Sequence, residues 1–353
     1  MSTLRDDYVV KLREYFHENP EESFKEFNTA RRIADELSKL SLKPVKMAET
    51  GVYADVRGNK DGRTVAFRAD IDALPVEEKN DVPYKSRNKG IMHACGHDAH
   101  TAMALGVAKY FSENRNFKGT VRVFFQPAEE APPGGAIKMI NEGLMDGVDY
   151  VIGQHVTSEI PAGSIGIRPG AANANSDSFF IKIFGKGGHG SAPHKSIDAI
   201  FLAVEYINLI QGIITRQTDP VKPAVITVGT INGGYRHNVI ADEVRLTGTV
   251  RTQDDETQRL IREELENLLK GLCKIYHATY DFNYEVGYPV MINDDKITSI
   301  VKEVSSSIVG EKNVFQMPQR MGGEDFGYYL KRTKGSFYYL GVANETHKEM
   351  LSA

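Results

Sequence analysis

Apolar residues recur along the chain with two periods, one typical of helices and one typical of strands. Leu4, Tyr8, Leu12 and Phe16 follow one face of a helix. Further helices are expected at about 26–37, 99–110, 136–142, 197–214, 256–276 and 297–309. Strands are expected at 53–56, 64–70, 119–125, 150–156, 178–184, 224–231, 243–251, 279–285 and 336–340. This mixture of elements predicts an α/β protein.

The order of the elements changes near residue 173. Between 178 and 285 it reads βαββαβ, which is the order of a ferredoxin-like split unit. Because 353 residues are many for one hydrophobic core, two domains are expected. We expect an α/β/α domain with a mixed sheet, interrupted by the ferredoxin-like unit, with boundaries at 1–173, 174–287 and 288–353.

The composition restricts partners and compartment. A net charge of -4 gives no reason to expect nucleic acid or an anionic membrane as partner. Cys95 and Cys273 cannot form a disulfide framework, which fits a reducing interior. The first residues contain no apolar signal region. The most apolar run, 199–214, is interrupted by polar residues such as Glu205, so no membrane span is expected. These features favour a cytoplasmic protein.

The segment His93-Ala94-Cys95-Gly96-His97-Asp98-Ala99-His100 concentrates candidate metal ligands. Thiolate and imidazole are preferred ligands of zinc-like cations. Gly96 lets the backbone bend so that Cys95 and His97 face one point. Asp98 stands where a helix N-cap is expected. Helix capping or surface histidines are the structural alternative, and a redox cysteine is the competing functional one, although no second cysteine lies nearby.

Candidate ligands also follow the ends of three expected strands. Asp70, the pair Glu129 and Glu130, and His155 each stand at such an end. The carboxyl ends of buried strands are where α/β sheets build their sites. Paired carboxylates offer one group that binds a metal and one that moves protons. The alternatives are a turn carboxylate for Asp70, a solvated acidic turn for the pair and a structural histidine for His155.

A glycine-rich turn at 185–194 carries His189 and His194. It lacks the GxxxxGK[ST] spacing of a phosphate-binding loop. It is either a mobile turn or a loop that presents His189 to a site.

Four segments together carry a family resemblance. In order they are His93-Ala94-Cys95-Gly96-His97-Asp98, Gln126-Pro127-Ala128-Glu129-Glu130, 187–194 and Gly323-Glu324-Asp325-Phe326. The chain resembles the M20 family of metal-dependent amidohydrolases, in the branch of aminoacylases, hippurate hydrolases and archaeal-type carboxypeptidases. The resemblance covers nearly the whole chain. It implies a catalytic domain with two divalent metal ions, Zn or Mn, a ferredoxin-like lid that dimerises, and a homodimer or higher homo-oligomer.

The resemblance also implies roles for single residues. Glu129 matches the general base, and His189 matches the lid histidine that reaches the partner subunit's site in dimers. Asn238 and Arg251 resemble groups that bind the substrate carboxylate, for which the planar guanidinium is suited. The implied metal ligands are Cys95, His97, Glu130 and His155.

The implied activity is metal-assisted hydrolysis of the amide bond in an N-acyl amino acid, or in a peptide with a free C-terminal carboxylate. An N-acetyl-amino acid deacetylase, for example one acting on N-acetyldiaminopimelate, is the alternative within this chemistry. The rivals of other classes are a noncatalytic binding descendant, and a cysteine hydrolase or redox sensor built on Cys95.

The sequence departs from the family near its C-terminus. A last metal-ligating histidine is implied there, yet no segment matches its usual surroundings, and His347 is the sole histidine in that region. We therefore expect the gene product to continue beyond Ala353, with His347 as the alternative ligand. One metal or none is then expected, and His347 should lie away from the Cys95 sulfur.

Overall fold

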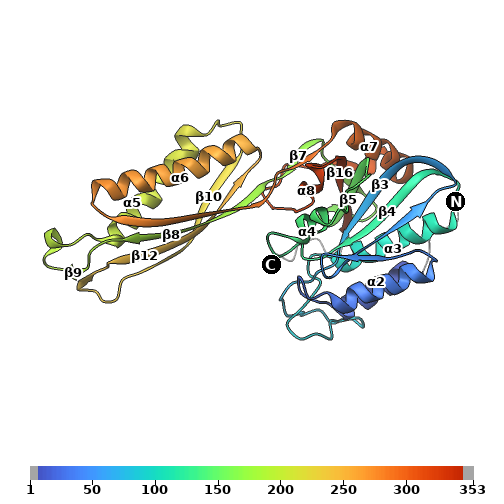
Figure 1. Ribbon diagram of the computed structural model, residues 1–353, viewed down its shortest axis with the longest axis horizontal. Helices are drawn as coiled ribbons and strands as arrows, with labels where there is room; N and C mark the ends of the chain where they lie inside the picture. Colours follow the sequence, from blue (N-terminus) through green and yellow to red (C-terminus); the bar gives the residue numbers. More distant parts are fainter. Residues whose placement is uncertain (1–6, 345–353) are drawn as a thin grey trace. The chain divides into compact units, whose positions relative to one another are not determined.

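The computed structural model describes residues 7–344 (Figure 1). They form two compact units. Unit 2 consists of Asn173–Val290 together with Arg320–Glu324, and unit 1 contains the parts of the chain on either side. Unit 1 has a hydrophobic core on each face of its sheet, and unit 2 has a core of its own.

Unit 1 is built on an eight-stranded mixed sheet in the order β1-β2-β4-β3-β5-β16-β6-β15. The central strands β4, β3, β5 and β16 run parallel to one another, whereas β2 pairs with β4 and β6 pairs with β16 in the antiparallel sense. The strands are β1 Val45–Met47, β2 Gly51–Arg57, β3 Lys60–Asp70, β4 Lys118–Gln126, β5 Tyr150–Pro161, β6 Ile165–Ile167, β15 Val314–Gln316 and β16 Lys334–Ala343.

Both faces of this sheet are buried. Val123 and Phe125 of β4 pack into one core with helices α1, α2 and α3, while Phe124 between them packs into a second core with α4 and α8. Successive strand residues point to opposite faces, so a sheet covered on both sides is apolar at consecutive positions. The helices of unit 1 are α1 Asp7–Glu18, α2 Phe27–Lys39, α3 His97–Glu113, α4 Gly135–Asn141, α7 Asp295–Val309, α8 Gly327–Leu330 and the 3-10 turn η3 Glu311–Asn313.

Unit 2 is a four-stranded antiparallel sheet in the order β10-β12-β8-β13. Two helices pack on one face, with Ile181, Leu246 and Leu265 among the buried residues between the layers. Its elements are β8 Asn175–Phe184, α5 Ala199–Gly212, η2 Ile213–Gln217, β10 Ala224–Gly233, β12 Glu243–Thr252, α6 Asp255–Ile275 and β13 Thr279–Tyr288. The predicted fold class, a mixed α/β sheet interrupted by a βαββαβ unit, is confirmed.

Short elements complete the chain. The glycine-rich turn forms β9 Gly188–His189, which pairs with β11 Val239–Ile240 and precedes the 3-10 turn η1 Pro193–Lys195. The strands β7 Gly170–Asn173 and β14 Met291–Asn293 pair with each other.

One expectation about unit 2 needs correction. The helix Ala199–Gln217 is long and apolar enough to cross a membrane by length and composition alone, with a mean hydropathy of 1.3. The polar residues that interrupt it do not lower its hydropathy far enough to exclude this. One face of the helix, including Leu202 and Tyr206, packs into the unit 2 core. Only 33% of the apolar window is buried, and the other face of the helix exposes large apolar side chains such as Phe201.

Candidate metal centre

The candidate ligands lie in unit 1, at the carboxyl ends of its central parallel strands. Glu129 and Glu130 follow β4, His155 lies on β5, and His97 is the first residue of α3. The strand ends of an open α/β sheet are where polar side chains meet without interrupting the ladder of hydrogen bonds. The sheet therefore brings together residues that are far apart in the sequence.

Five of the predicted residues form one cluster. Ligand atoms of Cys95, His97 and His155 lie within 4.8 Å of one another, and so do those of His97, Glu129 and Glu130. The Cys95 Sγ is 3.6 Å from His155 Nε2. His97 belongs to both groups and is fully buried, so it stands at the centre of the arrangement.

His97 is held by a residue that sequence reasoning did not single out. Its Nδ1 lies 2.9 Å from the Asp72 carbonyl oxygen and 3.3 Å from the Asp72 carboxylate. The same carboxylate accepts hydrogen bonds from the Ser23 hydroxyl and the Glu130 amide. A metal-binding histidine commonly donates its second nitrogen to a carboxylate or carbonyl in this way. The signal in the sequence is the second acid of the Asp70-Ile71-Asp72 run.

The unpaired atoms of the cluster fit a cation. His97 Nε2 and Glu130 Oε1 are buried and have no hydrogen-bond partner among the described residues. Buried polar atoms are nearly always paired, so such atoms beside a thiol need an explanation. Nitrogen, sulfur and carboxylate donors together suit zinc and similar transition metals. The residues present therefore fit a metal site.

The electrostatics of the cluster depend on burial. Burial lowers the pKa of His155 to about 3, which leaves the imidazole neutral. Burial raises the pKa of the Cys95 thiol, although His97 opposes this. Burial also lowers the pKa of His97, but Asp70 and Asp72 outweigh it and the net pKa is raised. A reactive redox thiol has a lowered pKa, so the raised pKa of Cys95 does not favour the redox alternative.

The predicted N-cap role of Asp98 is wrong. Helix α3 begins at His97, with Gly96 as its N-cap at a left-handed φ of 88°. The Asp98 carboxylate instead binds His17 Nδ1 at 2.7 Å and Arg13 Nε at 2.9 Å. Asp98 does not cap α3, because it lies inside the helix and two residues of α1 bind its carboxylate.

Glu129 and Glu130 follow a sharp bend in the chain. Ala128 has a left-handed φ of 52°, and its amide donates to the buried Glu26 carboxylate at 2.8 Å. Glu129 is buried, whereas Glu130 is half-buried. Glu26 thus supports the segment that carries both carboxylates. It lies more than a hundred residues away, and no local pattern indicated it.

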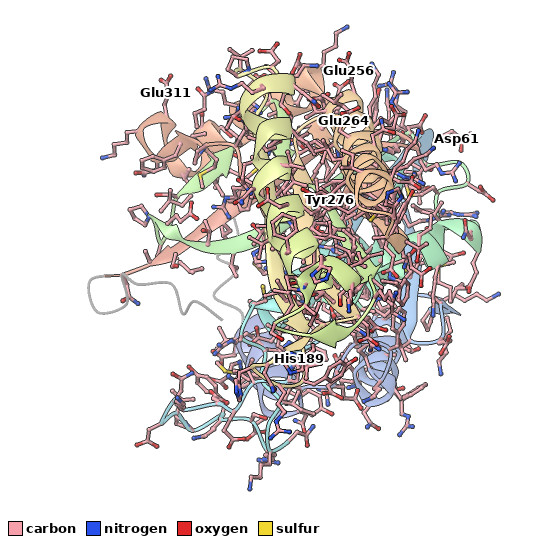
Figure 2. The ribbon with its side chains drawn as sticks, turned by 90° about the vertical axis from the view of Figure 1, so that its left-hand side faces the viewer. Asp61, His189, Glu256, Glu264, Tyr276 and Glu311 are labelled. Carbon is pink, nitrogen blue, oxygen red and sulfur yellow. The ribbon has the colours of Figure 1, made fainter. Side chains whose placement is uncertain are left out.

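The other predicted residues lie in unit 2. His189 is exposed on β9, and its Nδ1 accepts from the Ser191 amide at 3.2 Å (Figure 2). Asn238 is brought beside it, because the Gly190 amide donates to the Asn238 carbonyl at 2.9 Å. Arg251 is half-buried on β12. His347 lies outside the described residues.

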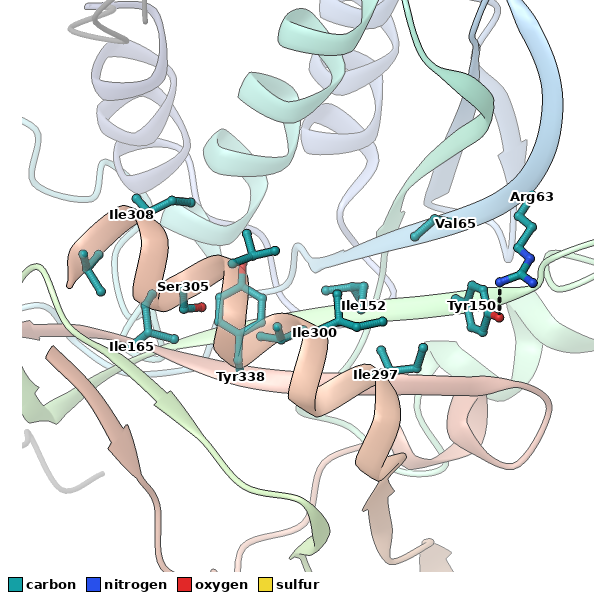
Figure 3. Close-up of a pocket in the computed structure, with 13 residues that line it drawn as sticks. Arg63, Val65, Tyr150, Ile152, Ile165, Ile297, Ile300, Ser305, Ile308 and Tyr338 are labelled. Atoms are coloured by element: carbon teal, nitrogen blue, oxygen red, sulfur yellow. Dashed lines mark hydrogen bonds between the residues drawn. The ribbon is translucent and has the colours of Figure 1, made fainter. Parts of the chain in front are cut away.

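An apolar cavity of about 510 Å³ lies elsewhere in unit 1, against α7 (Figure 3). At one end Arg63 Nη1 donates to the Tyr150 hydroxyl at 2.6 Å. Ile152, Ile300 and Tyr338 also line it. None of the described residues that line the cavity belongs to the ligand cluster, so this cavity is separate from the metal centre.

Comparison with known proteins agrees with the geometry. The sequence pattern of "Peptidase family M20/M25/M40" matches residues 66–352. The chain is 43% identical over 345 residues to the "Thermostable carboxypeptidase 2" of Saccharolobus solfataricus, covering 96% of this chain and 87% of that protein. It is 40% identical to the "N-acetyl-L-cysteine deacetylase" of Bacillus subtilis, covering 97% and 82% of the two chains. The crystal structure of the Bacillus subtilis YXEP protein, "a dinuclear metal binding peptidase from M20 family", is 34% identical, covers 94% and 88%, and superposes with a TM-score of 0.83.

Proposed function

Because the chain belongs to peptidase family M20/M25/M40 and is thus a metal-dependent amidohydrolase or peptidase, we propose that it hydrolyses N-acyl amino acids or peptides with a free C-terminal carboxylate. The observation that carries the proposal is the convergence of Cys95, His97 and His155 with the carboxylates of Glu129 and Glu130. We propose the cytoplasm as its location.

The proposed site takes two divalent metal ions, zinc or manganese. When bound, they supply a Lewis acid and lower the pKa of water. The residues that would hold them are Cys95, His97, Glu130 and His155, with Asp72 orienting the His97 ring.

Glu129 is the proposed proton carrier. It is buried, and its ligand atom lies within 4.8 Å of those of His97 and Glu130. As a general base it takes a proton from water, and as a general acid it passes that proton to the leaving amine. One carboxylate can serve both steps because the first step protonates it and the second step removes that proton again. Because Glu129 is shielded from bulk water, its electrostatic interactions with the reacting groups are stronger than they would be in solvent.

Residues of unit 2 are proposed to bind the substrate. His189 would stabilise the oxyanion across a dimer interface, and Asn238 and Arg251 would bind the carboxylate. An exposed apolar face on α5, which includes Phe201, Val204 and Leu209, supports self-association. Large exposed apolar side chains on one face are typical of an interface.

The acyl group distinguishes two versions of the proposal. One relative is named a carboxypeptidase and another an N-acetyl-L-cysteine deacetylase. N-acetyl amino acids, with N-acetyldiaminopimelate among them, are the substrates of the second version. Both versions use the same ligands and the same base, so they differ only in the pocket around the acyl group.

The test is a substrate panel on protein reconstituted with Zn²⁺ or Mn²⁺. It compares N-acetyl, N-benzoyl and N-blocked dipeptide substrates by release of the free amine. Each substrate is paired with its C-terminal amide, which removes the carboxylate and should be cleaved at least about tenfold more slowly. The Glu129→Gln variant controls for contaminating activity. Preference for the N-acetyl series would favour the deacetylase version, and binding without turnover of any substrate would favour a noncatalytic descendant.

A further inference from the structure

We propose that His100 is a positioning residue for the ligand His155, acting through the backbone of Val156. His100 Nε2 lies 2.9 Å from the Val156 amide nitrogen. On the other side of the ring, His100 Nδ1 lies 2.5 Å from the Asp70 carboxylate. His100 is fully buried, so both of its ring nitrogens are used inside the protein.

The partners of His100 fix its tautomer. A backbone amide can only donate, so His100 Nε2 must accept the Val156 hydrogen bond and carry no proton. Nδ1 therefore carries the proton and donates it to the Asp70 carboxylate. The ring acts as a rigid connection between a carboxylate and a backbone amide.

The sheet explains why Val156 needs this partner. The parallel pairing of β5 with β3 runs from Tyr150 to Gly153 only, whereas the pairing of β5 with β16 continues to Pro161. Beyond Gly153, no strand of residues 7–344 pairs with the β3 side of β5, and the amide of the half-buried Val156 would lack a protein acceptor there. His100 Nε2 accepts the hydrogen bond that a neighbouring strand would otherwise accept.

Val156 in turn holds the ligand. The Val156 carbonyl accepts a hydrogen bond from His155 Nδ1 at 2.6 Å. The His100 and His155 rings also pack edge to face, with centroids 4.6 Å apart. His155 Nε2 is left directed toward Cys95, at 3.6 Å from the sulfur. A shift of the Val156 backbone would move the ligand nitrogen.

The connection extends to a motif that the proposed reaction leaves unused. Arg68 is fully buried and donates to Asp70 through Nη1 at 2.5 Å and to Asp325 through Nη2 at 2.9 Å. Gln126 accepts from Arg68 Nε at 3.0 Å and donates to Asp325 at 2.7 Å. The Gly323-Glu324-Asp325-Phe326 motif therefore contributes Asp325 to the support of Asp70, and through it of His100.

Two variants of one residue separate the two contacts. His100→Asn keeps a donor where Nδ1 faces Asp70 but removes the acceptor for Val156. His100→Gln places an amide oxygen near the former Nε2 and keeps that acceptor. This inference rests on the proposed metal site but not on the proposed substrate, so the readout is Co²⁺ binding without substrate. Co²⁺ bound by a thiolate gives a sulfur-to-metal charge-transfer band that reports the geometry around Cys95.

We expect His100→Asn to weaken Co²⁺ binding by about 10- to 100-fold and to change the band, as is typical when a support of a metal ligand is lost. His100→Gln should restore most of the affinity. Leu105→Ala, in the core on the same helix, is the control: it should lower the thermal midpoint of the metal-free protein and leave Co²⁺ affinity unchanged.

Wild-type affinity and spectrum in His100→Asn would overturn the inference. Equal losses in His100→Asn and His100→Gln, accompanied by a drop in the metal-free midpoint like that of Leu105→Ala, would assign His100 a purely structural role. Failure of the wild type to bind Co²⁺ would contradict the metal site and this inference together. Co²⁺ binding with no hydrolysis of any panel substrate would contradict only the proposed reaction.

Discussion

The two units bury different chemistry. The core of unit 2 between its sheet and helices consists of apolar residues such as Ile181, Leu202 and Leu246. Its sheet is covered on one side, and the first half of β10 alternates between half-buried and exposed positions. Unit 1 is covered on both faces and buries charged residues, among them Arg68 and Asp70, at its strand ends. Hydrophobic burial accounts for the core of unit 2, although Asp177 of β8 is also buried there, whereas unit 1 gathers several charges whose burial costs free energy.

The two kinds of buried residue contribute differently to stability and to function. In a sheet with one apolar face, burial of the apolar residues stabilises the fold. The same residues form the alternating pattern from which the sheet is predicted. The ion network of unit 1 costs desolvation free energy and needs complete pairing. We interpret this desolvation cost as the consequence of holding the metal ligands in fixed positions. Substitutions in each of the two units test this comparison.

The largest effect is expected at the proposed base. Glu129→Gln should retain metal and lower kcat by about 10²- to 10⁴-fold, since the amide cannot accept a proton. Glu130→Gln should lose metal as well as activity, because Glu130 is the proposed ligand. Kinetics and metal analysis on the same preparations check this. Equal metal loss in both variants would contradict the division of roles.

The next effect compares the two cores directly. Arg68→Met should destabilise unit 1 by about 3–5 kcal/mol, because it leaves two buried carboxylates without their cation. Leu246→Ala should destabilise unit 2 by about 2–5 kcal/mol, since it creates a cavity. Urea denaturation of the metal-free protein measures both. Arg68→Met should also weaken Co²⁺ binding, and an unchanged Co²⁺ affinity would show that the ion network serves folding only.

A third prediction concerns the exposed His189 of unit 2. If it acts on the partner subunit's site, mixing inactive His189→Ala with inactive Glu129→Gln protein should restore activity. Random exchange places one intact site in half of the dimers, so up to about a quarter of the wild-type rate is expected. Subunit exchange is verified independently with differently tagged chains. Exchange without recovered activity would rule out action across the interface.

The smallest effect is a pH dependence in unit 1. Burial lowers the pKa of His17, but hydrogen bonds and charges from Asp98 and Glu78 outweigh it, and the net pKa is raised. Because the folded pKa exceeds the unfolded value of 6.5, this contribution is fully present below pH 6.5 and is lost as pH rises through the folded pKa. Thermal midpoints measured across this range should fall for the wild type. His17→Asn should reduce that slope, and an identical slope would contradict the assignment.

Periodicity predicted most of the helices and strands, and the βαββαβ order predicted the sheet of unit 2. The ligand candidates were visible because Cys95, His97 and the Glu129–Glu130 pair stand beside turns or strand ends. Their supports were harder to identify. Asp72 stands in a visible acidic run, but its contacts with His97 and the Glu130 amide cross 25 residues or more. Glu26 contacts the Ala128 amide across 102 residues, so no local pattern indicated these roles. Asp98 was misassigned because capping preferences describe an isolated helix, whereas α1 engages this side chain.

The residue at position 96 is restricted both by its own backbone conformation and by the side chain of Val156. A Cβ built there would lie 2.5 Å from a methyl carbon of Val156, and the φ of 88° disfavours any side chain. Val156 is also the residue between His100 and His155. A larger residue at 96 would need a smaller one at 156 and would still have to adopt a left-handed φ, so a change at 156 alone cannot accommodate it. Natural variants should therefore keep glycine at 96 whatever residue stands at 156, whereas position 156 can change to a smaller residue without any change at 96.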